Sequence, residues 1–524
     1  MKLVIGVTAL WTAGVAAGQG DLRLVVLQGD PVPGFAGAAF AGSLGTPVIN
    51  ASGSVAFTCG TSGTMSGGVF SDAGGLHVVA RSGGAAPGAG GRAFADFGSP
   101  PVYLSDGGSV AFSHGLTGSP AGSTGIWAEG TGGLNIVALN GMPSPSAPLG
   151  TYTMTGFQAI AVAPNGVIAF NCNFTDAAGT LWHALFSGAP GSIGMHARQD
   201  VPPGGTGFTS FGFPMINRGS GLCVPAGFYD GAHSRTGIFT GPSGGLLATA
   251  TSDSPAPDRH GDPMPGNTRF GTFGTSVVNG ANAVAFLSTL TGANAGVIGL
   301  FAFDAHGLHL VALPGDAAEG LPAGVTIGSL FNSTPSYADN GDLLVGVTLT
   351  GAGVNSSNDI AILRYRGTTL SVAVREGQTT ADRAGTTIEL ASNTTICTNA
   401  SGQLAFVGTL QPGNVEAVLG TDRVGNLVTV YRSPAAYTVR AGMRRSFGGF
   451  IMQAGGSGND GRPRSMNDSG EIVLGAYANI PPGEPFGQNG RCVLVLRIPD
   501  LCTADFNGDG FLDFFDYDDF VSCY

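Results

Sequence analysis

The fold is decided by one stretch, Val48-Ile49-Asn50-Ala51-Ser52-Gly53-Ser54-Val55-Ala56-Phe57, because variants of it return along the whole chain. We call this stretch the repeat motif. It consists of a small or Asn residue, two variable positions, a Gly and a short apolar strand. Further copies span residues 105–112, 163–170, 217–224, 279–286, 338–345, 399–406 and 467–474. Eight copies of one unit indicate a repeat architecture.

The Gly position of the motif is its most informative one. Glycine adopts positive φ freely, and Asn is the best ordinary substitute. We therefore expect a left-handed residue in a tight reversal, and Ser220 is the one copy that breaks this rule. A reversal between two apolar runs predicts a β-hairpin. The eight copies read Gly53, Gly108, Gly166, Ser220, Asn282, Gly341, Gly402 and Gly470.

Each repeat unit contains four short strands. In the first unit they are a strand ending at Ile49, the motif strand from Val55, an apolar run around Val69 and an alternating strand over 76–81. The unit recurs every 54 to 68 residues. Four-stranded units of roughly 40–50 residues are typical of β-propeller blades, and we place the excess in loops. A β-solenoid is the rival, but its turns are usually about half this length.

The two ends of the repeat region complement each other. Residues 22–27 have the pattern of a fourth strand, whereas the last unit, 465–499, holds only the first three strands. We therefore predict an all-β propeller over 19–499, in which the N-terminal strand completes the last blade and closes the ring. This arrangement gives eight blades; seven blades with one degenerate unit is the alternative.

Composition excludes several classes of protein. The chain has 524 residues and a formal net charge of −12, which disfavours nucleic-acid binding because that needs a basic surface. Its one lysine is Lys2, so neither Schiff-base catalysis nor a P-loop is expected after it. No His-Glu-x-x-His motif occurs in the sequence.

The N-terminus has the pattern of a signal peptide. Lys2 precedes an apolar run over 3–17, and Ala16-Ala17-Gly18 supplies small residues for cleavage. We expect residues 1–18 to be removed and the protein to be extracellular or at the cell surface. No later run approaches the roughly 20 apolar residues of a membrane span, so we expect no transmembrane segment after cleavage.

The last segment, 500–524, carries a calcium-loop motif. Calcium prefers many oxygen ligands, with Gly at the sixth loop position for a sharp turn and a carboxylate at the twelfth. Cys502 and Cys523 bracket the loop, and in a secreted chain we predict a disulfide between them, worth roughly 3 kcal/mol. The expected ligands are Asp505, Asn507, Asp509, the Phe511 carbonyl, Asp513 and Asp516.

Asp516, at the loop's last position, stands where most such loops have Glu. With this Asp, the segment resembles one half of a dockerin, and more closely the short Cys-bracketed dockerin-like endings of certain bacterial secreted proteins. A typical dockerin has two such loops, and this chain has one. The repeats resemble the tandem Asn-x-x-Gly-x-Val-Ala-Phe family of bacterial exported proteins, whose members carry varied C-terminal anchors (choice-of-anchor proteins). The resemblance implies a surface or extracellular role, with a cohesin-like or sorting partner for the tail.

Two functions fit these features. The first is a non-catalytic binding or scaffold module for a glycan or a surface protein, attached or sorted through its calcium tail. The alternative is a secreted polysaccharide-acting hydrolase or lyase that uses the axial pocket of the propeller. We assign no catalytic residue. The richest polar neighbourhood on the blade-to-blade loops supplies the candidate ligand-binding residues Asp230, His233, Arg235, Asp258, Arg259, His260 and Asp262.

Two further patterns receive a structural interpretation. Aromatic pairs at a spacing of three, such as Phe94 and Phe97, are expected to pack between blades. Five cysteines on blade strands, without metal-ligand spacing, are expected to be buried. The arginines of the last unit are expected to form a solvated face, with binding of an acidic partner as the alternative; they are Arg432, Arg440, Arg444, Arg445, Arg462 and Arg464.

Overall fold

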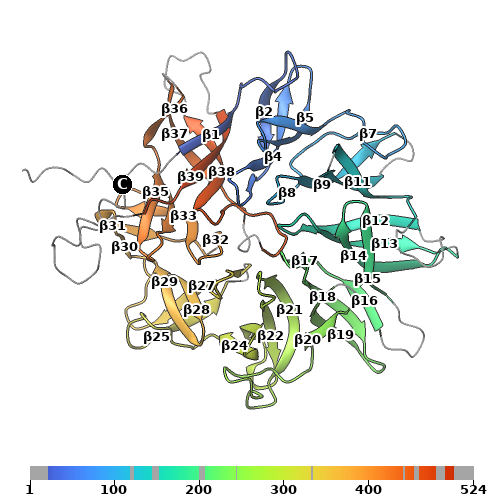
Figure 1. Cartoon of the computed structure of the whole chain (residues 1–524). Helices are drawn as coiled ribbons and strands as arrows, with labels where there is room; N and C mark the ends of the chain where they lie inside the picture. The colour runs from blue at the N-terminus through green and yellow to red at the C-terminus, as the bar shows by residue number, and fades with distance from the viewer. Residues whose placement is uncertain are drawn as a thin grey trace, which may run out of the picture.

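Eight antiparallel sheets stand around one axis and form an eight-bladed β-propeller (Figure 1). The computed structural model describes residues 22–500 except 119–122, 131, 144–152, 177, 200–206, 243–244, 332–333, 393, 441–442, 454–458 and 480–489. The signal peptide, the calcium ligands and the Cys502–Cys523 bridge expected from the sequence lie outside these residues. Within the described ranges, no helix has the length and apolar character needed to cross a membrane.

The first four blades follow one another along the chain. Blade 1 holds β2 (Ala39–Leu44), β3 (Val48–Ile49), β4 (Val55–Ser62), β5 (Gly67–Ser71) and β6 (His77–Arg81). Blade 2 holds β7 (Ala93–Phe94), β8 (Val102–Leu104), β9 (Val110–Thr117), β10 (Thr124–Gly130) and β11 (Gly133–Leu139). Blade 3 holds β12 (Thr153–Val162), β13 (Ile168–Thr175), β14 (Leu181–Ala189) and β15 (Ser192–Arg198). Blade 4 holds β16 (Gly207–Phe211), β17 (Met215–Ile216), β18 (Leu222–Tyr229), β19 (Ser234–Gly241) and β20 (Leu247–Thr251).

The remaining blades complete the ring. Blade 5 holds β21 (Arg269–Val278), β22 (Val284–Thr291), the 3-10 helix η1 (Gly292–Asn294), β23 (Ile298–Asp304) and β24 (Gly307–Ala312). Blade 6 holds β25 (Val325–Leu330), β26 (Ser336–Tyr337), β27 (Leu343–Gly351), β28 (Ile360–Arg366) and β29 (Thr369–Arg375). Blade 7 holds β30 (Thr379–Thr380), β31 (Arg383–Glu389), β32 (Ile396–Thr398), β33 (Leu404–Gln411), β34 (Val415–Thr421) and β35 (Leu427–Arg432). Blade 8 holds β36 (Ala436–Arg440), β37 (Met443–Ile451), β38 (Glu471–Asn479) and β39 (Gly490–Arg497).

The N-terminal strand closes the ring, as the sequence predicts. β1 (Leu22–Leu27) pairs antiparallel with β39, with Leu22 opposite Leu496 and Leu27 opposite Cys492. In Figure 1 this blue strand lies in the same sheet as the red strands of blade 8. The eight-blade prediction is therefore confirmed. The expected four strands per blade are present, but in several blades the innermost strand is divided in two, as β2 and β3 are in blade 1.

The core consists of clusters at the junctions between blades. Eight hydrophobic clusters are found among the described residues, and each joins two neighbouring blades. At the junction of blades 1 and 2, for example, Val69 of β5 packs with Phe94, Phe97 and Trp127 of blade 2. This confirms the packing role expected for the spaced aromatics. Each blade depends on its neighbours for burial, as in other repeat architectures.

The motif turns have the left-handed conformation expected for a tight reversal. The φ angles at Gly53 and Gly470 are 81° and 77°. Ser220, the expected exception, follows the same rule with a φ of 64°, and its N–H donates to the Asn217 carbonyl at 2.9 Å as in the other copies. The left-handed turn expected at this position is therefore confirmed even where the residue is neither Gly nor Asn. The turn is imposed by the ring, and Ser220 adopts it at a cost of roughly 1–2 kcal/mol.

The Asn that opens the motif explains how the blades are joined. Asn50 Oδ1 accepts from the N–H groups of Ser52 (3.1 Å) and Ser54 (2.9 Å), which fixes the turn. Asn50 Nδ2 donates to the Ser105 carbonyl of the next blade at 3.0 Å. One side chain therefore holds its own turn and binds the neighbouring turn. The same bridge runs from Asn217 to Asn279 O (2.9 Å), from Asn279 to Ala338 O (3.1 Å) and from Asn467 to Asn50 O (3.2 Å).

Copies that lack this bridge make another one. In blades 3 and 6 the Asn stands two positions later, where Asn165 donates to Arg218 O at 2.8 Å and Asn340 to Ser401 O at 2.7 Å. Blade 2 uses the Asp106 N–H, which donates to Pro164 O at 2.8 Å. Blade 7 uses the Ala400 N–H, which donates to the Asp468 carboxylate at 2.9 Å. Every junction of the ring thus has a hydrogen bond between motif turns.

Candidate functional site

The two faces of the propeller differ in what lies on them. We call the face formed by the eight motif turns the motif face. The loops that join blade to blade, and those between the second and third strands of each blade, lie on the opposite side, which we call the open face. Both faces meet at the axis, which is lined by the innermost strands.

A segment of blade 8 crosses the axis. We call residues 459–464, which follow β37, the axial segment. Its carbonyl groups accept from inner strands of three other blades, with Asp460 O bonded to Ile216 N at 3.0 Å and Gly461 O to Val162 N at 2.7 Å. Arg464 O accepts from Ile49 N at 3.0 Å. The segment passes through the middle of the ring in Figure 1. Because these donors immediately precede motif copies, the segment closes the channel near the motif face.

Side chains fasten the axial segment as well. Arg464 is 6% exposed and donates to Ile49 O at 2.9 Å and to Asp106 Oδ1 at 2.5 Å. Asn459 Nδ2 donates to Asp339 Oδ2 at 2.5 Å. Gly461 has a φ of 77°, and a Cβ there would lie 2.8 Å from Ile216 Cγ2. The segment therefore fits this position only with glycine at 461.

These contacts correct the expectation for the arginines of the last unit. Arg464 and Arg445 are buried, and Arg440 forms an ion pair with Asp30 at 2.5 Å. Arg462 is bound by Asp460, which is 1% exposed, through Nε at 2.8 Å and Nη2 at 2.5 Å. Arg432, Arg440 and Arg444 are the exposed members of the set. The six arginines do not form one solvated face, because three are exposed whereas Arg445 and Arg464 are buried and Arg462 is held by Asp460.

Above the axial segment lies a cavity of about 800 Å³, which we call the axial bowl. Five blades contribute to its lining, which places it on the axis. Most of the lining from the inner strands comes from residues shortly before a motif copy, so the bowl lies on the open-face side of the axial segment. Its lining residues are Pro101, Tyr103, Phe213, Met215, Pro225, Gly274, Thr275, Ser276, Thr334, Gln453, Arg462 and Pro463.

Phe213 and Tyr103 give the bowl its chemical character. Phe213 precedes β17 and is 44% exposed, which is unusual for a large apolar side chain beside a core. Tyr103 on β8 is 5% exposed. Both also line an adjoining hollow of about 130 Å³, together with Phe157 and Gln158. Burial raises the pKa of the Tyr103 hydroxyl, so it stays protonated at neutral pH and acts as a donor.

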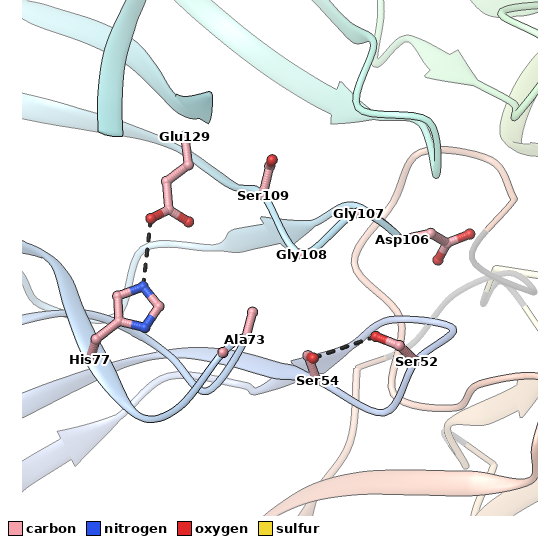
Figure 2. Close-up of a pocket in the computed structure, with 10 residues that line it drawn as sticks. Ser52, Ser54, Ala73, His77, Asp106, Gly107, Gly108, Ser109 and Glu129 are labelled. Atoms are coloured by element: carbon pink, nitrogen blue, oxygen red, sulfur yellow. Dashed lines mark hydrogen bonds and ion pairs between the residues drawn. The ribbon is translucent and has the colours of Figure 1, made fainter. Parts of the chain in front are cut away.

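A second cavity, of about 470 Å³, lies on the motif face between blades 1 and 2; we call it the motif-face hollow. Figure 2 shows His77 and Glu129 facing each other, with Ser52 and Ser54 on the turn of blade 1. His77 Nε2 lies 3.6 Å from Glu129 Oε1. Glu129 Oε2 also accepts from Val110 N at 3.1 Å, which ties this carboxylate to the start of β9.

The candidate residues of blade 4 lie on the open-face loops in two separate groups. Asp230 pairs with Arg235, which also binds Asp253 Oδ2 at 2.7 Å. The Arg235 side chain holds the pKa of Asp230 below its ordinary value. His233 is exposed, and its backbone N–H donates to Asp230 Oδ1 at 2.7 Å. These contacts tie the loop after β18 to the end of β20.

The second group belongs to the rim of blade 5. Arg259 binds Asp316 at 2.6 Å and the Val311 carbonyl at 2.7 Å. Asp258 Oδ1 accepts from the N–H groups of His260 (2.8 Å) and Asp262 (3.1 Å), which shapes a turn. None of these four residues lines the axial bowl or the motif-face hollow. The sequence grouped the seven residues by proximity along the chain, whereas the fold divides them.

The described cysteines are buried as expected. All five have free thiols in the structure, and burial raises the pKa of Cys59, Cys172, Cys223 and Cys397 to about 12. Buried protonated thiols are poor nucleophiles. Across the described ranges, no group of three or more His, Cys, Asp or Glu residues is placed to hold a metal ion.

The sequence predicts an axial pocket but not the residues that line it, because the lining is not a polar cluster. Tyr103, Phe213 and Met215 look like ordinary apolar residues before a motif copy. A usable signal was position: residues two to five places before each copy end the inner strand and therefore face the axis.

The chain is weakly similar to several solved structures. The chain matches "Structure of Dos1 propeller" with 9% identity and a TM-score of 0.40, covering 92% of this chain and 97% of that one. It matches "Crystal structure of polysaccharide lyase Uly1" with 10% identity and a TM-score of 0.34, covering 77% and 92%. A PL25 ulvan lyase bound to a saccharide has 11% identity and a TM-score of 0.30, covering 91% and 94%. Likeness at this level carries no argument about function.

No curated protein matches the chain in sequence. One family model does, over residues 6–73 and 62–477, which include the whole ring except its final strands. By this match the chain belongs to the family described as "Family of unknown function (DUF7453)".

Proposed function

We propose that this protein is an exported, non-catalytic binding module that holds its ligand in the axial bowl. The observation that carries the proposal is the composition of that bowl. It combines an exposed aromatic ring, a buried phenol and an ion-paired guanidinium above a floor that the chain itself supplies. A concave, largely apolar cavity with a few convergent polar groups is the usual form of a ligand site.

The ionisable groups of the bowl favour binding over catalysis. A general base works best with a pKa near the working pH, and the Tyr103 hydroxyl is shifted away from that range. Arg462 is neutralised by Asp460, so it offers a hydrogen-bond donor and little net charge. Such groups can orient a ligand, whereas they are poorly suited to moving a proton.

The rigid ring supports the same proposal. Hydrogen bonds between motif turns join each blade to its neighbour, and a hydrophobic cluster fills each junction. A site on such a scaffold is formed before the ligand arrives, which lowers the entropy lost on binding. We expect the partner to be a glycan or a surface protein.

The test uses the secreted full-length chain against glycans and surface extracts. We expect saturable binding without turnover, measured by biolayer interferometry together with assays for new reducing ends and for unsaturated sugars. Efficient turnover of any polysaccharide would contradict the non-catalytic role.

A secreted hydrolase or lyase acting on polysaccharide is the second candidate, and the motif-face hollow favours it. An imidazole and a carboxylate 3.6 Å apart, beside three serine hydroxyls, are an acid–base pair in a cavity of suitable size. The variants His77→Ala and Glu129→Gln would abolish turnover if the hollow is catalytic. His233→Ala with His260→Ala tests the open-face loops in the same assay.

We further propose that the C-terminal segment attaches or sorts the module through a calcium loop formed by Asp505, Asn507, Asp509, Phe511, Asp513 and Asp516. The support is the donor set: five side chains with oxygen ligands and one carbonyl, at the spacing that calcium loops use. A cohesin-like or sorting protein is the proposed partner.

A further inference from the structure

We propose that the axial bowl recognises a neutral saccharide, with Phe213 stacking against one sugar face and Tyr103 and Arg462 donating to sugar oxygens. This inference rests on the proposed binding role of the bowl and specifies the ligand. Three observations carry it: an exposed ring, a phenol that opens into the bowl and the balance of charge.

Phe213 forms a wall between two spaces. It lines both the axial bowl and the adjoining hollow of about 130 Å³, and it keeps 44% of its surface exposed there. Other phenylalanines of blade 4 are packed; Phe211, two residues earlier, is 5% exposed. An aromatic face left bare inside a concavity offers a flat apolar surface to a ligand. The C–H face of a sugar ring has the complementary shape.

Tyr103 presents a donor to the bowl. Its side chain is 5% exposed and lines the bowl, and its hydroxyl makes no hydrogen bond to another described residue but is not among the fully buried unpaired polar atoms, so it opens into the bowl. A hydroxyl that opens into a cavity can exchange its water partner for a ligand oxygen.

The charges indicate that the ligand is neutral. Arg462 is the one charged side chain in the lining of the bowl, and Asp460 already binds its Nε and Nη2. Nη1 has no hydrogen-bond partner among the described residues and remains a donor for the ligand. A uronate or sulfate group would enter without a free counter-charge, which is costly in a partly buried site.

The mixture of surfaces distinguishes a saccharide from other neutral ligands. A purely apolar ligand would cover the Tyr103 hydroxyl and Arg462 Nη1 without pairing them. A saccharide has apolar faces and hydroxylated edges, and the hydroxyls of Thr275 and Thr334 lie in the same lining. Extended proline-rich peptides also dock on aromatic grooves, so they form the competing class in the test.

The experiment measures binding of the full-length chain to an array of neutral oligosaccharides, uronate-containing oligosaccharides and proline-rich peptides, followed by titration calorimetry on the best binder. We expect neutral oligosaccharides to bind. Phe213→Ala should weaken binding at least about tenfold, and Tyr103→Phe, which removes only the hydroxyl, about three- to tenfold. The matched control is Phe303→Ala, since Phe303 is 37% exposed on β23 and outside the bowl, and it should leave affinity unchanged.

The outcomes separate this inference from the proposed function. Binding only of acidic saccharides or only of peptides, still lost in Phe213→Ala, overturns the neutral-saccharide inference and leaves the binding role of the bowl intact. Binding that neither variant changes, or no binding anywhere on the array, also overturns it. Turnover of the bound sugar contradicts the proposed function alone. Thermal unfolding of each variant near the wild-type temperature confirms that a lost signal reflects the site.

Discussion

The motif face and the open face of this propeller are built from the same repeats, but the two faces have different roles. On the motif face, each turn is bonded to the next, and the axial segment closes the channel. On the open face, the same inner strands surround a bowl lined by an exposed Phe213 and the Tyr103 phenol. The contrast indicates that the repeated residues fasten the ring, whereas residues outside the motif make the site.

The largest effect should follow from opening the seam of the ring, because both faces depend on it. Val26 of β1 is 2% exposed and packs with Val473, Val493 and Val495 of blade 8. Val26→Asp buries a charge without a partner and should lower the free energy of unfolding by about 3–5 kcal/mol. Urea unfolding followed by fluorescence measures it. The control Val424→Asp, at a residue 81% exposed, should change little, and equal loss in both variants would refute closure by β1.

Next in size is the closure of the axis. Gly461→Ala combines a disfavoured φ with contacts of 2.8 Å to Ile216 Cγ2 and 3.1 Å to Ala161 Cβ. Gly425→Ala is its matched control, because Gly425 has a φ of 96° and an added Cβ there meets nothing within 4 Å. We expect a loss of about 1–2 kcal/mol for the control and about 1–3 kcal/mol more for Gly461→Ala. Similar losses in chemical denaturation would mean that the segment does not pack against blades 3 and 4.

Disrupting a single motif turn should lower the free energy of unfolding less than disrupting the axial segment does. Asn279→Ala removes the bridge to Ala338 O and leaves the Ala281 and Ala283 N–H groups without their acceptor. We predict a loss of about 1–3 kcal/mol in unfolding free energy. Asn355→Ala removes a comparable local acceptor from an exposed loop without a bridge between blades, and should cost clearly less. Equal stability of the two variants would mean that the amide bridges between blades add no more stability than a local hydrogen bond in an exposed loop.

The pH dependence of stability should come from residues outside the motif turns, because the amide side chains of the turns do not titrate. His114 on β9 stacks on Phe97 with ring centroids 3.8 Å apart, and burial lowers its pKa below the ordinary 6.5 despite the Ala95 carbonyl and the Asp96 charge. The unfolded chain then binds the proton more readily, so stability is constant above about pH 6.5 and falls below it. His114→Gln should flatten that slope in unfolding curves between about pH 7.5 and about pH 5.5, values that bracket the ordinary pKa by about one unit. An unchanged slope would contradict a buried neutral His114.

The smallest effect on the ring should come from the calcium segment. Asp505→Ala should abolish calcium uptake in calorimetry while the melting temperature of the ring stays the same, because the loop lies outside the repeat region. Asp500→Ala, just before the loop, is the matched control and should keep calcium binding. Equal uptake by wild type and Asp505→Ala would rule out the loop as the calcium site.

Much of the ring could be predicted from the sequence because its determinants are local. The left-handed Gly of the motif, the fourth-strand pattern over 22–27 and the paired aromatics each follow from residues close together in the chain. The amide bridges were not foreseen, because the partner of Asn50 lies 55 residues away. The presence of Ser220 at a left-handed position has no local explanation, because serine does not favour positive φ.

The site was harder to predict for the same reason. The axial segment occurs once, so no repeat pattern marks it, and its contacts reach Ile49 and Val162 across hundreds of residues. The bowl gathers residues of mixed character from five blades, and these residues share no sequence motif. The polar candidates around Asp230 and Asp258 remain a prediction about the open-face loops, where the structure places them in two groups.

The most direct test of the account is hydrogen exchange, read by mass spectrometry, at the amides of Ile49, Val162 and Ile216. Each donates to the axial segment, at 3.0, 2.7 and 3.0 Å. If the segment closes the channel, these amides exchange only when the whole ring opens, as slowly as amides in the middle of the blade strands. Exchange as fast as that of an unstructured peptide would show that the axis is open near the motif face and would contradict the separation of a fastened face from an open one.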